Sequence, residues 1–112
     1  MIVATGNIFT DLPDASLGEV FQPLLEQDGV RIERIVSHGQ ATPEGEWYDQ
    51  GCDEWVLLLS GSARLLIEGE TEPRVLANGD HLLLPAGCRH RVEWTDPGRS
   101  TIWLAVHFGP GI

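Results

Sequence analysis

Residues Gly79 to Trp94 have the sequence Gly-Asp-His-Leu-Leu-Leu-Pro-Ala-Gly-Cys-Arg-His-Arg-Val-Glu-Trp, and they carry the most specific pattern in the chain. Residues 81–84 are mostly apolar and predict a short β-strand. This strand should end at Pro85, because proline has no N–H group to donate to a β-ladder. The next residues, Ala86 and Gly87, are typical of a tight corner that turns the chain back.

A second strand is expected immediately after this corner. Side chains alternate between the two faces of a strand, so His90, Val92 and Trp94 should share one face. A histidine at the start of a strand, on an apolar face and beside a tight corner, suits a metal ligand. The alternative is a buried histidine that hydrogen-bonds a backbone carbonyl.

The same stretch resembles the second sequence motif of the cupin family, Gly-x5-Pro-x-Gly-x2-His-x3-Asn. The matching positions are Gly79, Pro85, Gly87 and His90, with Trp94 in place of the final Asn. Upstream, Glu54 and Gly61 match the end of the first cupin motif, Gly-x5-His-x-His-x3,4-Glu-x6-Gly. The chain therefore resembles a small single-domain cupin over about residues 30–108.

Composition fits one compact β domain. The chain has 112 residues, including 13 Gly and 7 Pro, and a formal net charge of −10. Such an acidic chain repels phosphate backbones, so no nucleic-acid partner is expected. There is no lysine, which excludes Schiff-base and P-loop chemistry, and no nucleotide cofactor is expected.

Cellular location is predicted from two further features. The N-terminus has no signal-peptide pattern, and the longest apolar runs, 55–59 and 102–106, are too short to span a bilayer. We therefore expect a cytoplasmic protein without membrane contact, in which Cys52 and Cys88 are reduced thiols. A role for the two cysteines as ligands or as a redox pair is the alternative.

The rest of the chain predicts an all-β protein with one short N-terminal helix. Ser16 and Glu19 have the spacing of a helix capping box, followed by apolar residues at helical spacing and limited by Pro23. Residues 1–29 are thus expected to form an arm and a helix. Seven or eight short strands over residues 30–108 suit a sandwich or barrel, and the resemblance selects the cupin jelly roll, a double-stranded β-helix.

The resemblance also implies a metal site inside the barrel. Glu54 and His90 match two cupin ligands, but no His-x-His pair precedes Glu54. Its two positions fall on Trp47 and Asp49 with a four-residue spacer, or on Tyr48 and Gln50 with a three-residue spacer. The predicted ligands are Asp49, Glu54 and His90, a set that favours Mn²⁺, Fe²⁺ or Zn²⁺. The alternative is that Glu54 and His90 remain as a buried, hydrogen-bonded pair without metal.

The sequence also predicts a ligand-binding pocket beside the metal site. The pocket is expected to contain Trp47, Tyr48, Gln50 and Trp94, whose aromatic rings could stack on a flat or sugar-like ligand. His38 and His107 could complete a metal site, but a surface role for the first and packing inside the barrel for the second are favoured.

Three functions follow from these residues. The favoured one is a small cupin, expected as a homodimer, that binds a divalent metal and a small molecule, with any reaction assisted by the metal. The second is a metal-free binding or sensor domain. The third is a metal-independent isomerase or epimerase, with His90 as base and Tyr48 as acid.

Overall fold

The computed structural model describes all residues of the chain, 1–112, and consists of eight β-strands with no helix. The strands are β1 (Val20–Gln27), β2 (Val30–Ser37), β3 (Asp53–Ser60), β4 (Ala63–Ile67), β5 (Arg74–Leu76), β6 (His81–Leu84), β7 (His90–Thr95) and β8 (Thr101–Phe108). The all-β prediction is confirmed. No helix long and apolar enough to cross a membrane is present.

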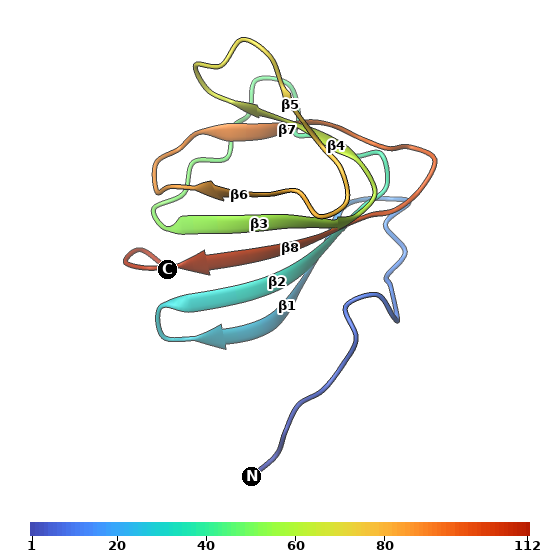
Figure 1. The fold of residues 1–112 in the computed structure, drawn as a ribbon, viewed down its shortest axis with the longest axis vertical. Helices are drawn as coiled ribbons and strands as arrows, with labels where there is room; N and C mark the ends of the chain where they lie inside the picture. The colour runs from blue at the N-terminus through green and yellow to red at the C-terminus, as the bar shows by residue number, and fades with distance from the viewer.

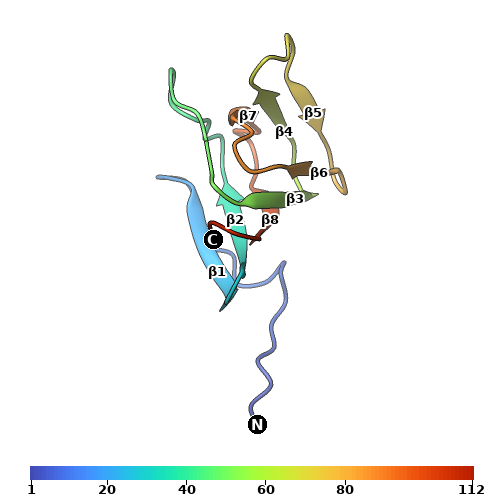
Figure 2. The same cartoon turned by 90° about the vertical axis from the view of Figure 1, so that its left-hand side faces the viewer.

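The strands form two facing antiparallel sheets. One has five strands in the order β1-β2-β8-β3-β6, and the other has three strands in the order β5-β4-β7. Figures 1 and 2 show the smaller sheet above the larger one, with the chain passing back and forth between them. Strands that are neighbours in a sheet are often distant in sequence, as β8 is between β2 and β3, which is the pattern of a jelly roll.

The predicted N-terminal helix is wrong, because this part of the chain forms strand β1 at the edge of the larger sheet. Pairing along β2 overrides the helical spacing of its apolar residues. Pro23 is tolerated in an edge strand, and the register shifts next to it. The capping box does not form either: the Ser16 N–H donates to Asp14 Oδ1, and the Glu19 carboxylate contacts the Ser37 hydroxyl.

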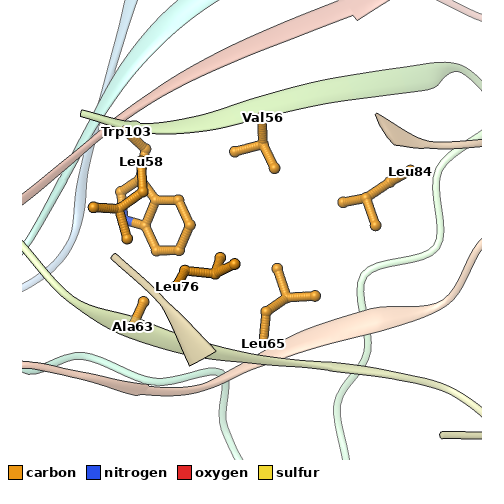
Figure 3. Close-up of a cluster of buried hydrophobic side chains, with 7 residues drawn as sticks. All are labelled: Val56, Leu58, Ala63, Leu65, Leu76, Leu84 and Trp103. Atoms are coloured by element: carbon orange, nitrogen blue, oxygen red, sulfur yellow. The ribbon is translucent and has the colours of Figure 1, made fainter. Parts of the chain in front are cut away.

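The hydrophobic core lies between the two sheets, and several of its side chains also line the cavity described below. It contains Val56, Leu58, Ala63, Leu65, Leu76, Leu84 and Trp103, all shown in Figure 3. Along β3 the buried residues alternate with half-exposed ones, so Glu54, Val56 and Leu58 share the inner face.

Gly61 has a structural reason to be glycine. Its φ angle is +117°, and a Cβ atom there would lie 2.5 Å from Thr101 Oγ1 and 2.7 Å from Thr101 Cα. The turn between β3 and β4 therefore passes too close to β8 for any side chain. This explains the glycine that ends the first motif.

A buried arginine fixes part of the N-terminal arm on the outer side of the larger sheet. Arg34 donates hydrogen bonds to the carbonyl oxygens of Ile8 (3.1 Å), Thr10 (2.8 Å) and Asp11 (3.2 Å). It also donates to Gln22 Oε1 on β1, at 2.8 Å. Residues before Asn7 extend away from the body of the molecule, and Met1, Ile2 and Val3 are exposed (Figure 1).

Candidate functional site

A cavity of about 310 Å³ opens between the two sheets beside the hydrophobic core. Strands β2, β3 and β8 of the larger sheet contribute most of its polar side chains, and β7 of the smaller sheet contributes His90. Apolar side chains come from both sheets. The cavity therefore combines apolar side chains with a few polar groups that converge on it, which is the usual composition of a small-molecule site.

The polar wall is built by the register of three adjacent strands. Arg31 on β2 pairs with His107 on β8, and His107 pairs in turn with Glu54 on β3. Paired residues in neighbouring strands project to the same face of a sheet, so all three side chains line the cavity. Glu33 lies two residues after Arg31 and projects to the same side.

Glu54 is the centre of this polar group and is only 7% exposed. Gln50 donates a hydrogen bond from Nε2 to Glu54 Oε1 at 2.8 Å. His90 Nε2 lies 3.5 Å from the same oxygen, and His107 Nε2 lies 3.7 Å from Oε2. His107 Nε2 is closer to Glu33 Oε1, at 3.0 Å. The Glu54 carboxylate therefore lies between the imidazoles of His90 and His107. The His107 imidazole also contacts the Glu33 carboxylate.

His90 is held by its backbone and by its ring. Its Nδ1 atom lies 2.9 Å from the carbonyl oxygen of Cys88. Because a carbonyl only accepts, Nδ1 carries the proton in this contact and Nε2 faces Glu54. The His90 ring also stacks on Tyr48, with centroids 5.5 Å apart and planes inclined by 21°.

The charges of the cluster shift the pKa values of its members in opposite directions. Burial raises the pKa of Glu54, but contacts with His90, His107 and Gln50 outweigh burial and lower it below its usual value. Burial lowers the pKa of His90, but the contact with Glu54 and the Cys88 carbonyl outweigh burial and raise it. Together these shifts favour the state in which Glu54 is ionised and His90 is protonated.

A third carboxyl group, Glu19, lines the cavity from the segment before β1. Burial raises the pKa of Glu19 and exceeds the opposite effect of its contact with the Ser37 hydroxyl. Ser37 Oγ also accepts a hydrogen bond from Trp103 Nε1, at 3.3 Å. Burial, together with the negative field of the nearby carboxylates, likewise raises the pKa of Tyr48, so its phenol stays protonated at neutral pH.

The structure brings some predicted site residues together and not others. Tyr48, Gln50, Glu54 and His90 all line the cavity. Asp49 is exposed and Trp47 is half-buried, and neither lines it. The alternation along this loop therefore agrees with the three-residue spacer of the first motif.

Trp94 lies away from the cavity because β7 contains a bulge. Val92 pairs with Leu65, but Trp94 pairs with the next residue of β4, Arg64, so the expected alternation is broken at Glu93. Trp94 consequently projects to the face where the Arg64 guanidinium lies 5.0 Å from its ring centroid. Val92 and His90 remain on the cavity side.

Two residues of the cluster were not assigned to the site from the sequence. No motif includes Glu33, and the sequence favours a packing role for His107. Their partners lie on strands distant in sequence, so only the pairing of β2, β8 and β3 brings them together. His38 does not line the cavity. Cys52 is buried with Sγ 4.0 Å from His107 Nδ1, and both cysteines are free.

The cluster fits a divalent metal only in part. No group of three or more His, Cys, Asp or Glu side chains is arranged to hold a metal ion. Glu54 and His90 offer one carboxylate and one imidazole, whereas His107 Nε2 is engaged by Glu33. Asp49, the third ligand predicted from the sequence, lies outside the cavity.

Known protein structures share the fold of this chain. No family model and no curated protein matches the chain. Among solved structures, an RmlC-like cupin from Desulfovibrio desulfuricans aligns with a TM-score of 0.76 at 16% identity, over 99% of this chain and all of that one. An RmlC-like cupin from Methanocaldococcus jannaschii, described as a double-stranded β-helix, aligns with a TM-score of 0.73 at 18% identity over 96% and 92% of the two chains. The two-sheet architecture and its interior site therefore define a double-stranded β-helix protein.

A third structure is much more similar in sequence. It is a protein of Ralstonia eutropha JMP134 named as a candidate mannose-6-phosphate isomerase. The two chains are 57% identical over 95% of this chain and 98% of that one, with a TM-score of 0.91. The present chain belongs to the cupin superfamily, as a small single-domain member.

Proposed function

We propose that this cupin binds a small polyhydroxy compound in its cavity and isomerises it by proton transfer. The observation that carries the proposal is the position of the Glu54 carboxylate between the imidazoles of His90 and His107, in a cavity that also contains the Tyr48 phenol. The name of the Ralstonia protein supports the same reaction class, isomerisation of a sugar.

The residues suggest how the reaction would proceed. In the fraction of molecules in which His90 Nε2 is unprotonated, a fraction that grows as pH rises above the raised pKa of His90, Nε2 would remove a proton from the carbon next to the substrate carbonyl and return it to the carbonyl carbon. Glu54 would stabilise the imidazolium formed between these steps, because it lies 3.5 Å from Nε2. The Tyr48 phenol would give its proton to the carbonyl oxygen as negative charge develops there and would take the proton of the neighbouring hydroxyl group in return, so that the carbonyl and hydroxyl groups exchange places.

Proton exchange with solvent tests this proposal directly. The protein is incubated in D2O with aldoses and ketoses, in free, 6-phosphorylated and 6-carboxylate forms, and deuterium at the carbon beside the carbonyl is followed by NMR. We expect incorporation with at least one form, and its loss in His90→Gln. His81→Gln is the matched control, because His81 is exposed and does not line the cavity. If no form exchanges above the rate in buffer, the isomerase proposal is wrong and a binding or sensor domain replaces it.

Metal binding is the second candidate function. It is favoured by the contact between His90 Nδ1 and the Cys88 carbonyl, which directs Nε2 into the cavity as in many metal-binding histidines. Glu54 and His90 would be the principal ligands of Mn²⁺, Fe²⁺ or Zn²⁺. When bound, such an ion would act as a Lewis acid.

We also propose that the protein is a homodimer. The N-terminal residues Met1, Ile2 and Val3 are apolar and exposed, and strand β1 is one of the two edge strands of the larger sheet. A second copy of the chain would cover both features.

A further inference from the structure

Arg31 is the one arginine of the chain that has no partner within it. Every other arginine has a hydrogen bond, an ion pair or an aromatic ring against its guanidinium: Arg34, Arg64, Arg74, Arg89, Arg91 and Arg99. Arg31 is half-buried and lines the cavity. A positive charge in this position is therefore available to a ligand.

The carboxyl groups of the cavity, in contrast, are all engaged. Glu54 accepts from Gln50 and lies beside His90, Glu33 contacts His107, and Glu19 contacts the Ser37 hydroxyl. Glu26 is the cross-strand neighbour of Arg31 on β1, but it is exposed and the two side chains form no ion pair. The charge left without a partner in the cavity is thus positive, although the protein as a whole is strongly acidic.

The position of Arg31 relates it to the reactive cluster. Arg31, His107 and Glu54 form one row across β2, β8 and β3. Strands lie about 4.8 Å apart, so the backbone at Arg31 is roughly 10 Å from that at Glu54. If Arg31 binds the anionic group of a sugar-sized ligand, the rest of that ligand can extend toward Glu54 and His90.

We propose that Arg31 binds a carboxylate of the ligand, so that the substrate class is the monoanionic sugar acids or hydroxy acids. This inference rests on the proposed function, because it assumes that the same cavity holds the substrate. The guanidinium offers a planar pair of N–H donors that matches a carboxylate.

A phosphate ester suits the cavity less well than a carboxylate. A phosphate monoester carries a charge of about −1.5 to −2 at pH 7. The cavity offers it one guanidinium, and three carboxyl groups line the same space. Phosphate sites also commonly use backbone N–H groups from glycine-rich loops or helix N-termini, but no glycine lines the cavity and the chain has no helix.

Binding of three matched probes tests the assignment. Isothermal titration calorimetry at low salt compares glucuronate, glucose 6-phosphate and glucose, which share a ring and differ in the group at carbon 6. We expect glucuronate to bind most tightly. Arg31→Gln should weaken glucuronate about 10- to 100-fold, the range for loss of a charge-assisted contact, and should leave glucose unchanged. Arg31→Lys should recover part of the loss.

Arg64→Gln is the control, because its side chain lies over Trp94 and outside the cavity. It should bind all three probes like the wild type. The carboxylate assignment is overturned if glucose 6-phosphate binds as tightly as glucuronate. The anchor itself is overturned if Arg31→Gln binds glucuronate normally, if glucose binds as tightly as glucuronate, or if no probe binds. Deuterium exchange reports separately on the proposed function, so exchange into a neutral sugar without any preference for anions would refute only the anchor.

Discussion

Tyr48 and His90 are joined along their backbones as well as through their rings. The Tyr48 N–H donates to the His90 carbonyl at 2.8 Å, and the His90 N–H donates to the Tyr48 carbonyl at 3.1 Å. The rings stack above this pair. The loop that precedes β3 is therefore attached to the start of β7, and the phenol and the imidazole keep a fixed relative position.

This attachment separates the chemical role of Tyr48 from its structural role. Tyr48→Phe keeps both backbone hydrogen bonds and the stacked ring and removes only the hydroxyl group. We expect a melting temperature close to that of the wild type and a loss of about 100- to 10,000-fold in deuterium exchange, the range for one general-acid group. Tyr48→Ala should lower both. Equal exchange in Tyr48→Phe and wild type would show that the phenol takes no part.

The contact between Glu54 and His90 predicts the titration of His90. In Glu54→Gln the stabilising carboxylate is gone and burial remains, so the pKa of His90 should fall from above its usual value of 6.5 toward or below it. NMR of the His90 ring protons measures this change. Glu70→Gln, on the exposed segment before β5, is the control and should leave the pKa of His90 in place. An unchanged pKa in Glu54→Gln would contradict the assigned contact.

Glu19 predicts an unusual dependence of stability on pH. Its pKa is raised in the folded protein, so its favourable contribution is present below the unfolded value of 4.5 and is lost as pH rises through the folded pKa. Glu19→Gln cannot ionise and should escape this loss. Urea unfolding from pH 4 to pH 8 should show the variant gaining stability relative to wild type as pH increases.

Glu44→Gln is the matched control for this experiment, because Glu44 is an exposed loop residue. Its stability should follow that of the wild type across the same pH range. A constant difference between Glu19→Gln and wild type at all pH values would mean that Glu19 has the same pKa in the folded and unfolded states.

Metal binding can be tested by thermal stability. If Glu54 and His90 hold a metal, then Mn²⁺, Fe²⁺ or Zn²⁺ should raise the melting temperature of the wild type and not that of His90→Ala, since a ligand stabilises only the state that binds it. Asp49→Asn should behave like the wild type, because Asp49 lies outside the cavity. His107→Gln shows whether the second imidazole contributes. The metal proposal fails if no ion shifts the wild type and none copurifies.

The dimer proposal needs a deletion that spares Arg34. Removing residues 1–12 would take away the carbonyl groups of Ile8, Thr10 and Asp11 and leave a buried guanidinium without acceptors. Removing only residues 1–6 keeps these bonds. We expect the shorter deletion to shift sedimentation from dimer to monomer at micromolar concentration, with a smaller effect on folding than the longer one. A monomeric wild type at that concentration would refute the proposal.

The fold could be predicted from the sequence because its turns require particular residues. Gly61 and Gly87 both have positive φ angles, which favour glycine, and Pro85 follows directly after the end of β6. These residues of the two motifs are therefore required by the local backbone geometry. The N-terminal segment could not be predicted in the same way. Its apolar spacing suits a helix, and only the neighbouring strand β2, which offers a complete ladder, makes it a strand.

For a similar reason, the sequence indicates only some of the residues that line the cavity. Glu54 and His90 belong to motifs, whereas Glu33 and His107 are 74 residues apart and meet only through strand pairing. Nothing in the local sequence of either residue indicates the other. Whether Tyr48 and Gln50 or Trp47 and Asp49 face inward depends on whether three or four residues separate the first-motif positions from Glu54. A His-x-His pair would have fixed this spacing, but the chain has none.

The bulge at Glu93 has a consequence for comparisons among related chains. It gives β7 one residue more than β4 between two fixed pairs, so every position after it projects to the face opposite to that expected from simple counting. Trp94, the last letter of the second motif, thus lies on the outer surface against Arg64 and can change without altering the shape of the cavity. In a related chain that keeps a residue at position 93 but pairs it regularly with the residue equivalent to Arg64, position 94 would project inward, and a tryptophan there would fill the interior.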